Sequence, residues 1–213
     1  MIANIVFCLI IGYAFGCFST GYICGKKQKV DVRAHGSGNI GTTNTLRTLG
    51  IKAGVLTLIG DMLKAIIPIV ILCIAYKKTN QPLARDLVVL YTGLGVVCGH
   101  NFPFWLKFKG GKGIAAMAGV IIAFNPWITI TEMILFIAIV LITRYVSLGS
   151  LAVATVLPIS VLIGYRNDPN YLHMVIICCI LMLLAFFKHR GNIKRLLTGT
   201  EHKFGEKKVQ EKE

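Results

Sequence analysis

The chain has 213 residues, of which 55% are hydrophobic and only 15% are charged, and its mean hydropathy is +0.70. Soluble domains average about 25% charged residues, so this composition excludes an ordinary soluble domain and indicates an integral membrane protein. The net charge of +14 lies mainly between apolar stretches, and no nucleic-acid-binding module fits the chain. We therefore expect membrane topology and anionic lipid, and no nucleic acid, to account for the charge.

Apolar segments of the length that crosses a bilayer follow one another along the chain. A spanning helix needs about 20 mainly apolar residues. The candidates are Ile2–Cys24, Ala53–Tyr76, Leu87–Cys98, Pro126–Ile142, Leu148–Tyr165 and Tyr171–Phe187. Ile114–Phe124 is apolar but short, and Asn125-Pro126 separates it from the next segment. The sequence predicts an all-α membrane protein with about seven transmembrane helices, with five crossings and a re-entrant pair as the alternative. The first segment has no basic flank or cleavage site, so we expect a retained helix.

Lysine and arginine are unevenly distributed among the loops. The loop 25–52 carries six, the loop 99–113 three and the segment from residue 188 onward eight, whereas the alternate loops carry few. Because cytoplasmic loops are rich in these residues, we expect the N-terminus outside and the C-terminus in the cytoplasm. The predicted organisation is one polytopic domain over 1–200, with functional loops 25–52, 99–113 and 188–201, and a polar cytoplasmic tail over 201–213.

The first glycine-rich segment, here called the first motif, reads Gly36-Ser37-Gly38-Asn39-Ile40-Gly41-Thr42-Thr43-Asn44. It satisfies the G-x-G-x-x-G pattern of dinucleotide-binding folds, but it follows a membrane helix and not a strand, so that interpretation fails. Glycine frees backbone N–H groups to face a ligand, and the Ser, Asn and Thr side chains add hydrogen-bond donors. With Arg47 close behind, the segment indicates a phosphate site at a membrane surface.

The second motif spans residues 99–113 and ends in Lys109-Gly110-Gly111-Lys112-Gly113. Its end is similar to a P-loop, but Gly113 replaces the required Ser or Thr, so a nucleoside triphosphatase is not indicated. Glycines around a lysine suit a close approach to phosphate, and the neighbouring aromatic residues are typical of a membrane interface.

The third motif spans residues 188–201 and contains His189-Arg190-Gly191-Asn192-Ile193-Lys194-Arg195. His100 of the second motif and His189 are candidate bases or phosphate ligands. Neither has an Asp five residues further on, so the His-x-x-x-x-Asp acyltransferase machinery is absent. Because all three motifs are predicted on one face, we expect them to form one site.

Three charged residues lie inside predicted spans. Asp61 and Lys64 are spaced to pair on one helix face, either as a functional pair or as structural support, and Glu132 is a lone acid without an assigned role. The seven cysteines show no metal-binding spacing and no disulfide framework, and we expect no metal and no cofactor.

Together, the three motifs resemble those of the bacterial acyl-phosphate:glycerol-3-phosphate acyltransferase family. The resemblance extends from Ile2 to about Lys203, with Thr42 where that family has alanine. It implies a bacterial inner-membrane enzyme with a cytoplasm-facing site. That enzyme transfers a fatty acyl group from acyl-phosphate to the 1-hydroxyl of sn-glycerol 3-phosphate, giving lysophosphatidic acid and phosphate. It also implies an acyl-phosphate synthase as a possible partner.

We assign site residues on these motifs as a hypothesis. The catalytic candidates are Ser37, Arg47, Lys112, His189 and Asn192. The substrate-binding candidates are Gly38, Asn39, Gly41, Thr43, Asn44, His100, Asn101, Lys109, Gly110, Gly111, Gly113 and Arg195. The base is either His189 or a phosphate oxygen of the donor, and Ser37 as an acyl-enzyme nucleophile is the weaker alternative. A transporter of a phosphorylated metabolite and a lipid-binding scaffold are the rival function classes.

Overall fold

The computed structural model describes residues 1–78 and 83–205, and every regular element in these ranges is helical. Two single 3-10 turns, at Val32–Ala34 and Phe104–Leu106, lie between the helices. The α-helices are α1 (Ile2–Gly16), α2 (Thr20–Lys27), α3 (Thr42–Leu49), α4 (Ile51–Lys78), α5 (Arg85–Asn101), α6 (Ile114–Phe124), α7 (Pro126–Thr143), α8 (Val146–Gly164), α9 (Tyr171–Lys188) and α10 (Arg190–Leu197). The prediction of an all-α fold is confirmed.

Six stretches of helix in the described residues are long and apolar enough to cross a membrane. They are Ile2–Lys27, Ile51–Lys78, Arg85–Leu106, Pro126–Thr143, Val146–Gly164 and Tyr171–Lys188. Five of them contain the corresponding segment predicted from the sequence, and the predicted Leu148–Tyr165 ends one residue beyond Val146–Gly164. The seventh, α6, has 11 residues and forms an antiparallel hairpin with α7, whose N-cap Asn125 accepts hydrogen bonds from the N–H groups of Trp127 and Ile128. The short apolar segment is therefore a separate helix.

The predicted first span is two helices and not one. α1 ends at Gly16, and α2 begins after Ser19, whose Oγ accepts the Tyr22 N–H at 3.4 Å. The interruption frees the Phe18 carbonyl, which accepts a hydrogen bond from the buried Lys64 side chain at 2.7 Å. The break is stable inside the bundle because a donor from another helix satisfies the freed backbone group.

Helix α1 packs backbone to backbone against α5. Gly12 and Gly16 on α1 face Gly95 and Gly99 on α5, each pair four residues apart. A Cβ atom at any of the four would overlap the backbone of the opposite helix. Small residues at this spacing let membrane helices approach closely. α5 also contacts α4, α6 and α9, so it forms the centre of the bundle.

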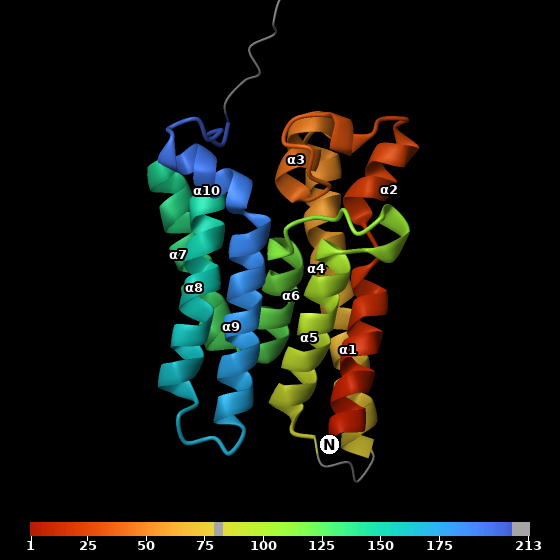
Figure 1. The fold of residues 1–213 in the computed structure, drawn as a ribbon, viewed down its shortest axis with the longest axis vertical. Helices are drawn as coiled ribbons and strands as arrows, with labels where there is room; N and C mark the ends of the chain where they lie inside the picture. The colour runs from red at the N-terminus through yellow and green to blue at the C-terminus, as the bar shows by residue number, and fades with distance from the viewer. Residues whose placement is uncertain (79–82, 206–213) are drawn as a thin grey trace, which may run out of the picture.

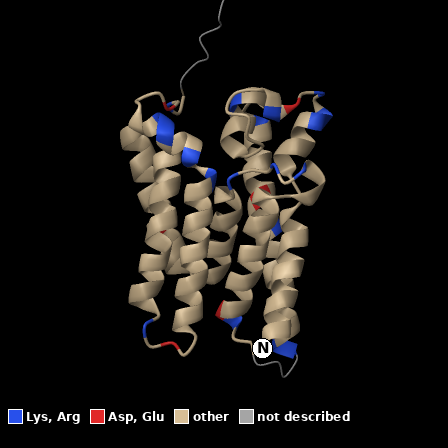
Figure 2. Ribbon diagram, viewed as in Figure 1, with Lys and Arg blue, Asp and Glu red and all other residues tan. Residues whose placement is uncertain are grey.

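The polar segments gather at one end of the bundle. Figure 1 shows α2, α3 and α10 at the end opposite the N-terminus, with the loop after α5 lying along their lower edge. Figure 2 shows that lysine and arginine concentrate at this end. The expected separation of the N-terminus from the functional loops is thus observed, while the side of the membrane that each faces stays a prediction.

Candidate active site

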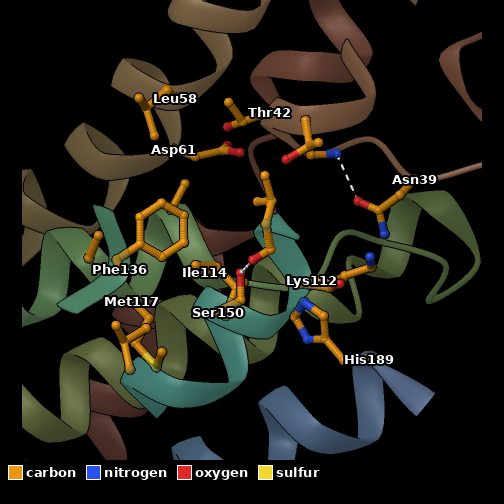
Figure 3. Close-up of a pocket in the computed structure, with 18 of the residues that line it drawn as sticks. Asn39, Thr42, Leu58, Asp61, Lys112, Ile114, Met117, Phe136, Ser150 and His189 are labelled. Carbon is orange, nitrogen blue, oxygen red and sulfur yellow. Dashed lines mark hydrogen bonds between the residues drawn. The ribbon is translucent and has the colours of Figure 1, made fainter. Parts of the chain in front are cut away.

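One cavity of about 570 Å³ joins the three motifs to the space between α4, α6, α7 and α8. Figure 3 shows Asn39, Lys112 and His189 on one side of it and Leu58, Met117 and Phe136 on the other. The cavity therefore has a polar end, built from segments far apart in the sequence, and an apolar end built from helices.

Asn44 holds the first motif in shape. Its Oδ1 accepts the Ser37 N–H at 2.8 Å, and its Nδ2 donates to the carbonyl oxygens of Val32 and His35, both at 3.0 Å. Gly36 has a φ of 60°, and a Cβ atom there would overlap Asn44 Oδ1, so this position requires glycine. The folded turn places Ser37 on the cavity wall.

Helix α3 presents its N-terminus to the cavity. Gly41 is its N-cap, and the Gly41 N–H donates to Asn39 Oδ1 at 2.9 Å. Thr42 and Thr43 of the first turn line the cavity, as does Arg47 one turn further on. The N–H groups of a helix's first turn have no partner within the helix and favour an anion, and Arg47 adds a positive charge.

Gly110 and Gly111 pack the second motif against the end of α5. The Gly110 N–H donates to the Asn101 carbonyl at 3.2 Å, and the Gly111 N–H donates to the His100 carbonyl at 3.0 Å. A Cβ atom on Gly110 would overlap the His100 carbonyl oxygen, and one on Gly111 would overlap the His100 ring. Both amides are therefore used within the second motif, which reaches the cavity wall through His100, Lys112 and Gly113.

Lys112 connects the second motif to the third. Its Nζ donates to Asn192 Oδ1 at 2.6 Å. Burial lowers the pKa of Lys112 to about 8, with Glu201 opposing the shift and Arg195 and Arg47 adding to it. At neutral pH the side chain is still mainly an ammonium, so it directs a positive charge into the cavity.

Glu201 orients the polar side chains around Lys112. Its Oε1 accepts from Asn192 Nδ2 at 2.6 Å and from Ser147 Oγ at 2.8 Å, and its Oε2 accepts from Arg195 Nε at 2.7 Å. Burial raises the pKa of the Glu201 carboxyl, but these three hydrogen bonds outweigh burial and hold it below its usual value. The predicted polar tail thus begins inside the site.

His189 lies between α9 and α10 and is only 2% exposed. Its Nδ1 is 2.8 Å from the Ala185 carbonyl oxygen, and because a carbonyl only accepts, the proton lies on Nδ1 and the lone pair on Nε2. Burial, together with the charge on Lys112, lowers the pKa of His189 to about 4. At neutral pH the ring is an uncharged hydrogen-bond acceptor.

A buried cluster of Asp61, Lys64 and His100 lies beneath the second motif, inside the bundle. Lys64 Nζ lies 2.9 Å from Asp61 Oδ1 and 2.7 Å from both the Phe18 carbonyl oxygen and His100 Nδ1. Because the Lys64 ammonium only donates, His100 Nδ1 accepts, and the His100 proton therefore lies on Nε2, the ring atom that packs against Gly111. The predicted pairing of Asp61 with Lys64 is confirmed.

The apolar end of the cavity opens toward the side of the bundle. Leu58, Ile122 and Met133 line it, yet they are 39%, 40% and 54% exposed. Large apolar residues exposed on a membrane helix face lipid hydrocarbon. A long apolar chain therefore has a path between the cavity and the bilayer.

Most of the predicted site residues lie on the cavity wall. They are Ser37, Asn39, Gly41, Thr43, Asn44, Arg47, His100, Lys112, Gly113, His189, Asn192 and Arg195. The cavity lining does not include Gly38, Asn101, Lys109, Gly110 or Gly111. Of these, Asn101, Gly110 and Gly111 take part in loop packing, and Gly38 has the left-handed φ of 69° that its turn needs.

Sequence reasoning missed five polar residues of the lining: Thr129, Ser147, Ser150, Glu201 and His202. Thr42 was counted among the hydrogen-bond donors of the first motif but left out of the assigned site residues, and it too lines the cavity. Glu201 closes the third motif but was assigned to a tail, because nothing in its neighbours shows that the chain folds back. In the part of the chain that the structure describes, no group of three His, Cys, Asp or Glu side chains is placed to hold a metal ion.

A family model described as glycerol-3-phosphate acyltransferase matches residues 6–199. Curated glycerol-3-phosphate acyltransferases are similar along nearly their whole length. The protein of Thermoanaerobacter pseudethanolicus is 39% identical over 199 residues, covering 93% of this chain and 94% of the relative. That of Clostridioides difficile is 41% identical over 208 residues, covering 93% and 95%.

Two solved structures share the fold. Both are of PlsY (YgiH), an integral membrane glycerol 3-phosphate acyltransferase. Its glycerol 3-phosphate form superposes with a TM-score of 0.81 at 36% identity, covering 94% of this chain and 96% of that one. Its lysophosphatidic acid form gives a TM-score of 0.78 at 35% identity, covering 94% and 95%.

Proposed function

The chain belongs to the glycerol-3-phosphate acyltransferase family, and we propose that it transfers a fatty acyl group from acyl-phosphate to the 1-hydroxyl of sn-glycerol 3-phosphate. The products are lysophosphatidic acid and inorganic phosphate. We place the reaction at the cytoplasmic face of a bacterial inner membrane, because the basic loops lie at the same end as the cavity mouth. A separate enzyme that makes acyl-phosphate is the expected supplier of the donor.

The observation that carries the proposal is the two-part cavity. Its polar end gathers Arg47, Lys112 and Arg195, which suit the phosphates of both substrates. Its apolar end opens through Leu58 and Met133 to the side of the bundle and suits a fatty chain. The two ends support a reaction between a phosphorylated substrate and one that carries a hydrocarbon tail.

We assign phosphate binding to the groups that direct positive charge into the cavity. Lys112, fixed by Asn192, and Arg195, fixed by Glu201, hold one side of the site. Arg47 and the first turn of α3 hold the other side. Ser37 and Asn39 orient substrate oxygens, and the packing glycines at 110 and 111 fix Lys112 without contacting phosphate themselves.

The chemical step needs a proton acceptor and little acid catalysis. The 1-hydroxyl oxygen attacks the acyl carbonyl carbon, the bond from that carbon to the phosphate oxygen breaks, and phosphate leaves. We assign the hydroxyl proton to the departing phosphate, because His189, with a pKa of about 4, is a weak base at neutral pH. His189 Nε2 instead accepts a hydrogen bond from the neighbouring 2-hydroxyl of glycerol 3-phosphate, which helps to aim the 1-hydroxyl at the carbonyl carbon.

Direct transfer is favoured over an acyl-enzyme on Ser37. Among the described residues, no histidine or carboxylate is hydrogen-bonded to Ser37 Oγ, so nothing activates it as a nucleophile. A burst of acylated protein that Ser37→Ala abolishes would reverse this assignment.

The test is phosphate release by the purified protein with dodecanoyl phosphate or palmitoyl phosphate and glycerol 3-phosphate, with acyl-CoA as a parallel donor. We expect release that requires glycerol 3-phosphate and produces lysophosphatidic acid, and no turnover of acyl-CoA. Turnover of acyl-CoA alone would refute the donor assignment. Movement of glycerol 3-phosphate into proteoliposomes without product would favour a transporter.

A further inference from the structure

The segment that follows α10 crosses the polar end of the cavity. The chain runs without helix from residue 201 to residue 205, and these residues are here called the strap. In Figure 1 the strap arches over the ends of α7 and α10. Three of its residues, Glu201, His202 and Phe204, line the cavity. The strap therefore forms part of the wall around the proposed phosphate sites.

Arg144, which belongs to none of the three motifs, fixes the far end of the strap. The Phe204 N–H donates to the Arg144 carbonyl at 2.7 Å. Arg144 Nε and Nη2 both donate to the Phe204 carbonyl, at 3.2 and 2.9 Å. One residue thus satisfies both backbone groups of Phe204, through its own backbone and through its guanidinium.

The fold holds Arg144 firmly enough for it to act as an anchor. Only Arg144 and Tyr145 connect α7 to α8, and the Arg144 N–H donates to the Val140 carbonyl at 2.8 Å. Arg144 has a φ of 62°, in the left-handed region that glycine adopts at lower cost. An arginine at a position that favours glycine indicates that its side chain has a role of its own.

The near end of the strap carries Glu201, whose carboxylate orients Asn192 and Arg195. The middle of the strap contacts the opposite side of the site, where Arg47 Nη2 donates to the His202 carbonyl at 3.4 Å. Fixing an irregular segment costs conformational entropy at each residue. Loss of the Arg144 guanidinium would remove two of the three hydrogen bonds at the far end, which loosens the segment that places Glu201.

We propose that Arg144 is a positioning residue for the binding of glycerol 3-phosphate. It acts through the strap on Glu201, and Glu201 in turn orients Asn192 and Arg195 toward the substrate. The inference rests on the acyl transfer proposed above and adds a residue from the connection between α7 and α8 to the same site.

The experiment measures the KM for glycerol 3-phosphate at saturating dodecanoyl phosphate. The Kd for glycerol 3-phosphate is measured by titration calorimetry without donor. The variants are Arg144→Ala, Arg144→Lys and Glu201→Ala, with Arg144→Ala also combined with Glu201→Ala. Arg166→Ala is the matched control, because Arg166 is an exposed arginine that follows α8 as Arg144 precedes it. Neither KM nor Kd depends on how much protein is folded, so a partly unstable variant remains informative.

We expect Arg144→Ala to raise KM and Kd about fivefold, the size of effect that a lost hydrogen bond has on an equilibrium. Lysine keeps one donor for the Phe204 carbonyl, so Arg144→Lys should raise both constants about twofold. Arg166→Ala should leave both constants unchanged. In the Glu201→Ala background, Arg144→Ala should add less than about twofold, because the two changes break the same series of contacts.

Two results would overturn the inference. A lower kcat with unchanged KM and Kd in Arg144→Ala would mean that Arg144 only stabilises the fold. An equal rise in Kd with and without Glu201 would mean that Arg144 does not act through Glu201. If the wild-type protein binds glycerol 3-phosphate but turns over no acyl phosphate, the proposed reaction fails, while the Kd values still decide the role of Arg144.

Discussion

Lys112 should lose its proton within the range of pH in which the enzyme is assayed, and activity should fall with that loss. The pKa of Lys112 is lowered to about 8, so the ammonium is present below this pH and is lost as the pH rises through it. Because the profile of kcat/KM reports the free enzyme, we expect an alkaline limb near pH 8. Between pH 7 and pH 10, kcat/KM should fall about a hundredfold, at roughly tenfold per unit above the pKa.

Lys112→Arg isolates the contribution of this charge. Arginine stays protonated throughout the range, so the alkaline limb should move above pH 10. The variant should be about tenfold less active at pH 7, because a planar guanidinium cannot repeat the 2.6 Å hydrogen bond of the ammonium to Asn192. Its activity should therefore equal that of the wild type near pH 9 and exceed it at pH 10.

The measurement is phosphate release over pH 6–10 at constant ionic strength, with the spontaneous hydrolysis of the donor subtracted. Lys52→Arg, an exposed lysine at the start of α4, serves as the control and should leave the profile unchanged. The same alkaline limb in the wild type and in Lys112→Arg would refute the assignment of this titration to Lys112.

Three further changes test the packing and the polar networks. Gly99→Ala should lower the free energy of unfolding by about 1–3 kcal/mol, because the added Cβ atom overlaps the α1 backbone. The measurement is thermal unfolding in detergent. Gly164→Ala is the control and should show no such loss, because the space around Gly164 is open. Lys64→Met should lower the free energy of unfolding by about 3–5 kcal/mol, since Asp61 is left as an unpaired buried charge. The double variant Lys64→Met with Asp61→Asn should regain part of this stability. Glu201→Ala should lower kcat/KM by about tenfold or more through the loss of three hydrogen bonds. A variant with the same kcat/KM as the wild type would show that these hydrogen bonds do not orient the site.

The membrane spans were predictable because apolar length is a local property of the sequence. The six long segments and the short Ile114–Phe124 all appear as helices, with ends displaced by a few residues. The interruption between α1 and α2 was not predictable in the same way. It depends on Lys64, 46 residues beyond Phe18 in the chain, which satisfies the freed carbonyl.

The site residues that belong to the three sequence motifs could be predicted. Ser37, Arg47, Lys112, His189 and Asn192 all reach one cavity, as their shared face implied. The role of each glycine could not be predicted from the sequence. A glycine that leaves room for a ligand and a glycine that leaves room for a neighbouring side chain look the same in the sequence. Gly111 is of the second kind, since the His100 ring occupies the space of its missing side chain. The position of Glu201 depends on the chain folding back across α10, which no local pattern records.

The placement of Asp61 and Lys64 one turn apart has a consequence for the biogenesis of the protein. Each charge alone at the centre of a helix opposes insertion by about 2.5–3.5 kcal/mol. Since the two side chains contact each other within α4 itself, at 2.9 Å, they form a net-neutral unit before any other helix has arrived. Helix α4 therefore enters the bilayer as an apolar segment with an internal dipole. In the folded bundle the lysine also donates to the Phe18 carbonyl, which ties the break between α1 and α2 to α4.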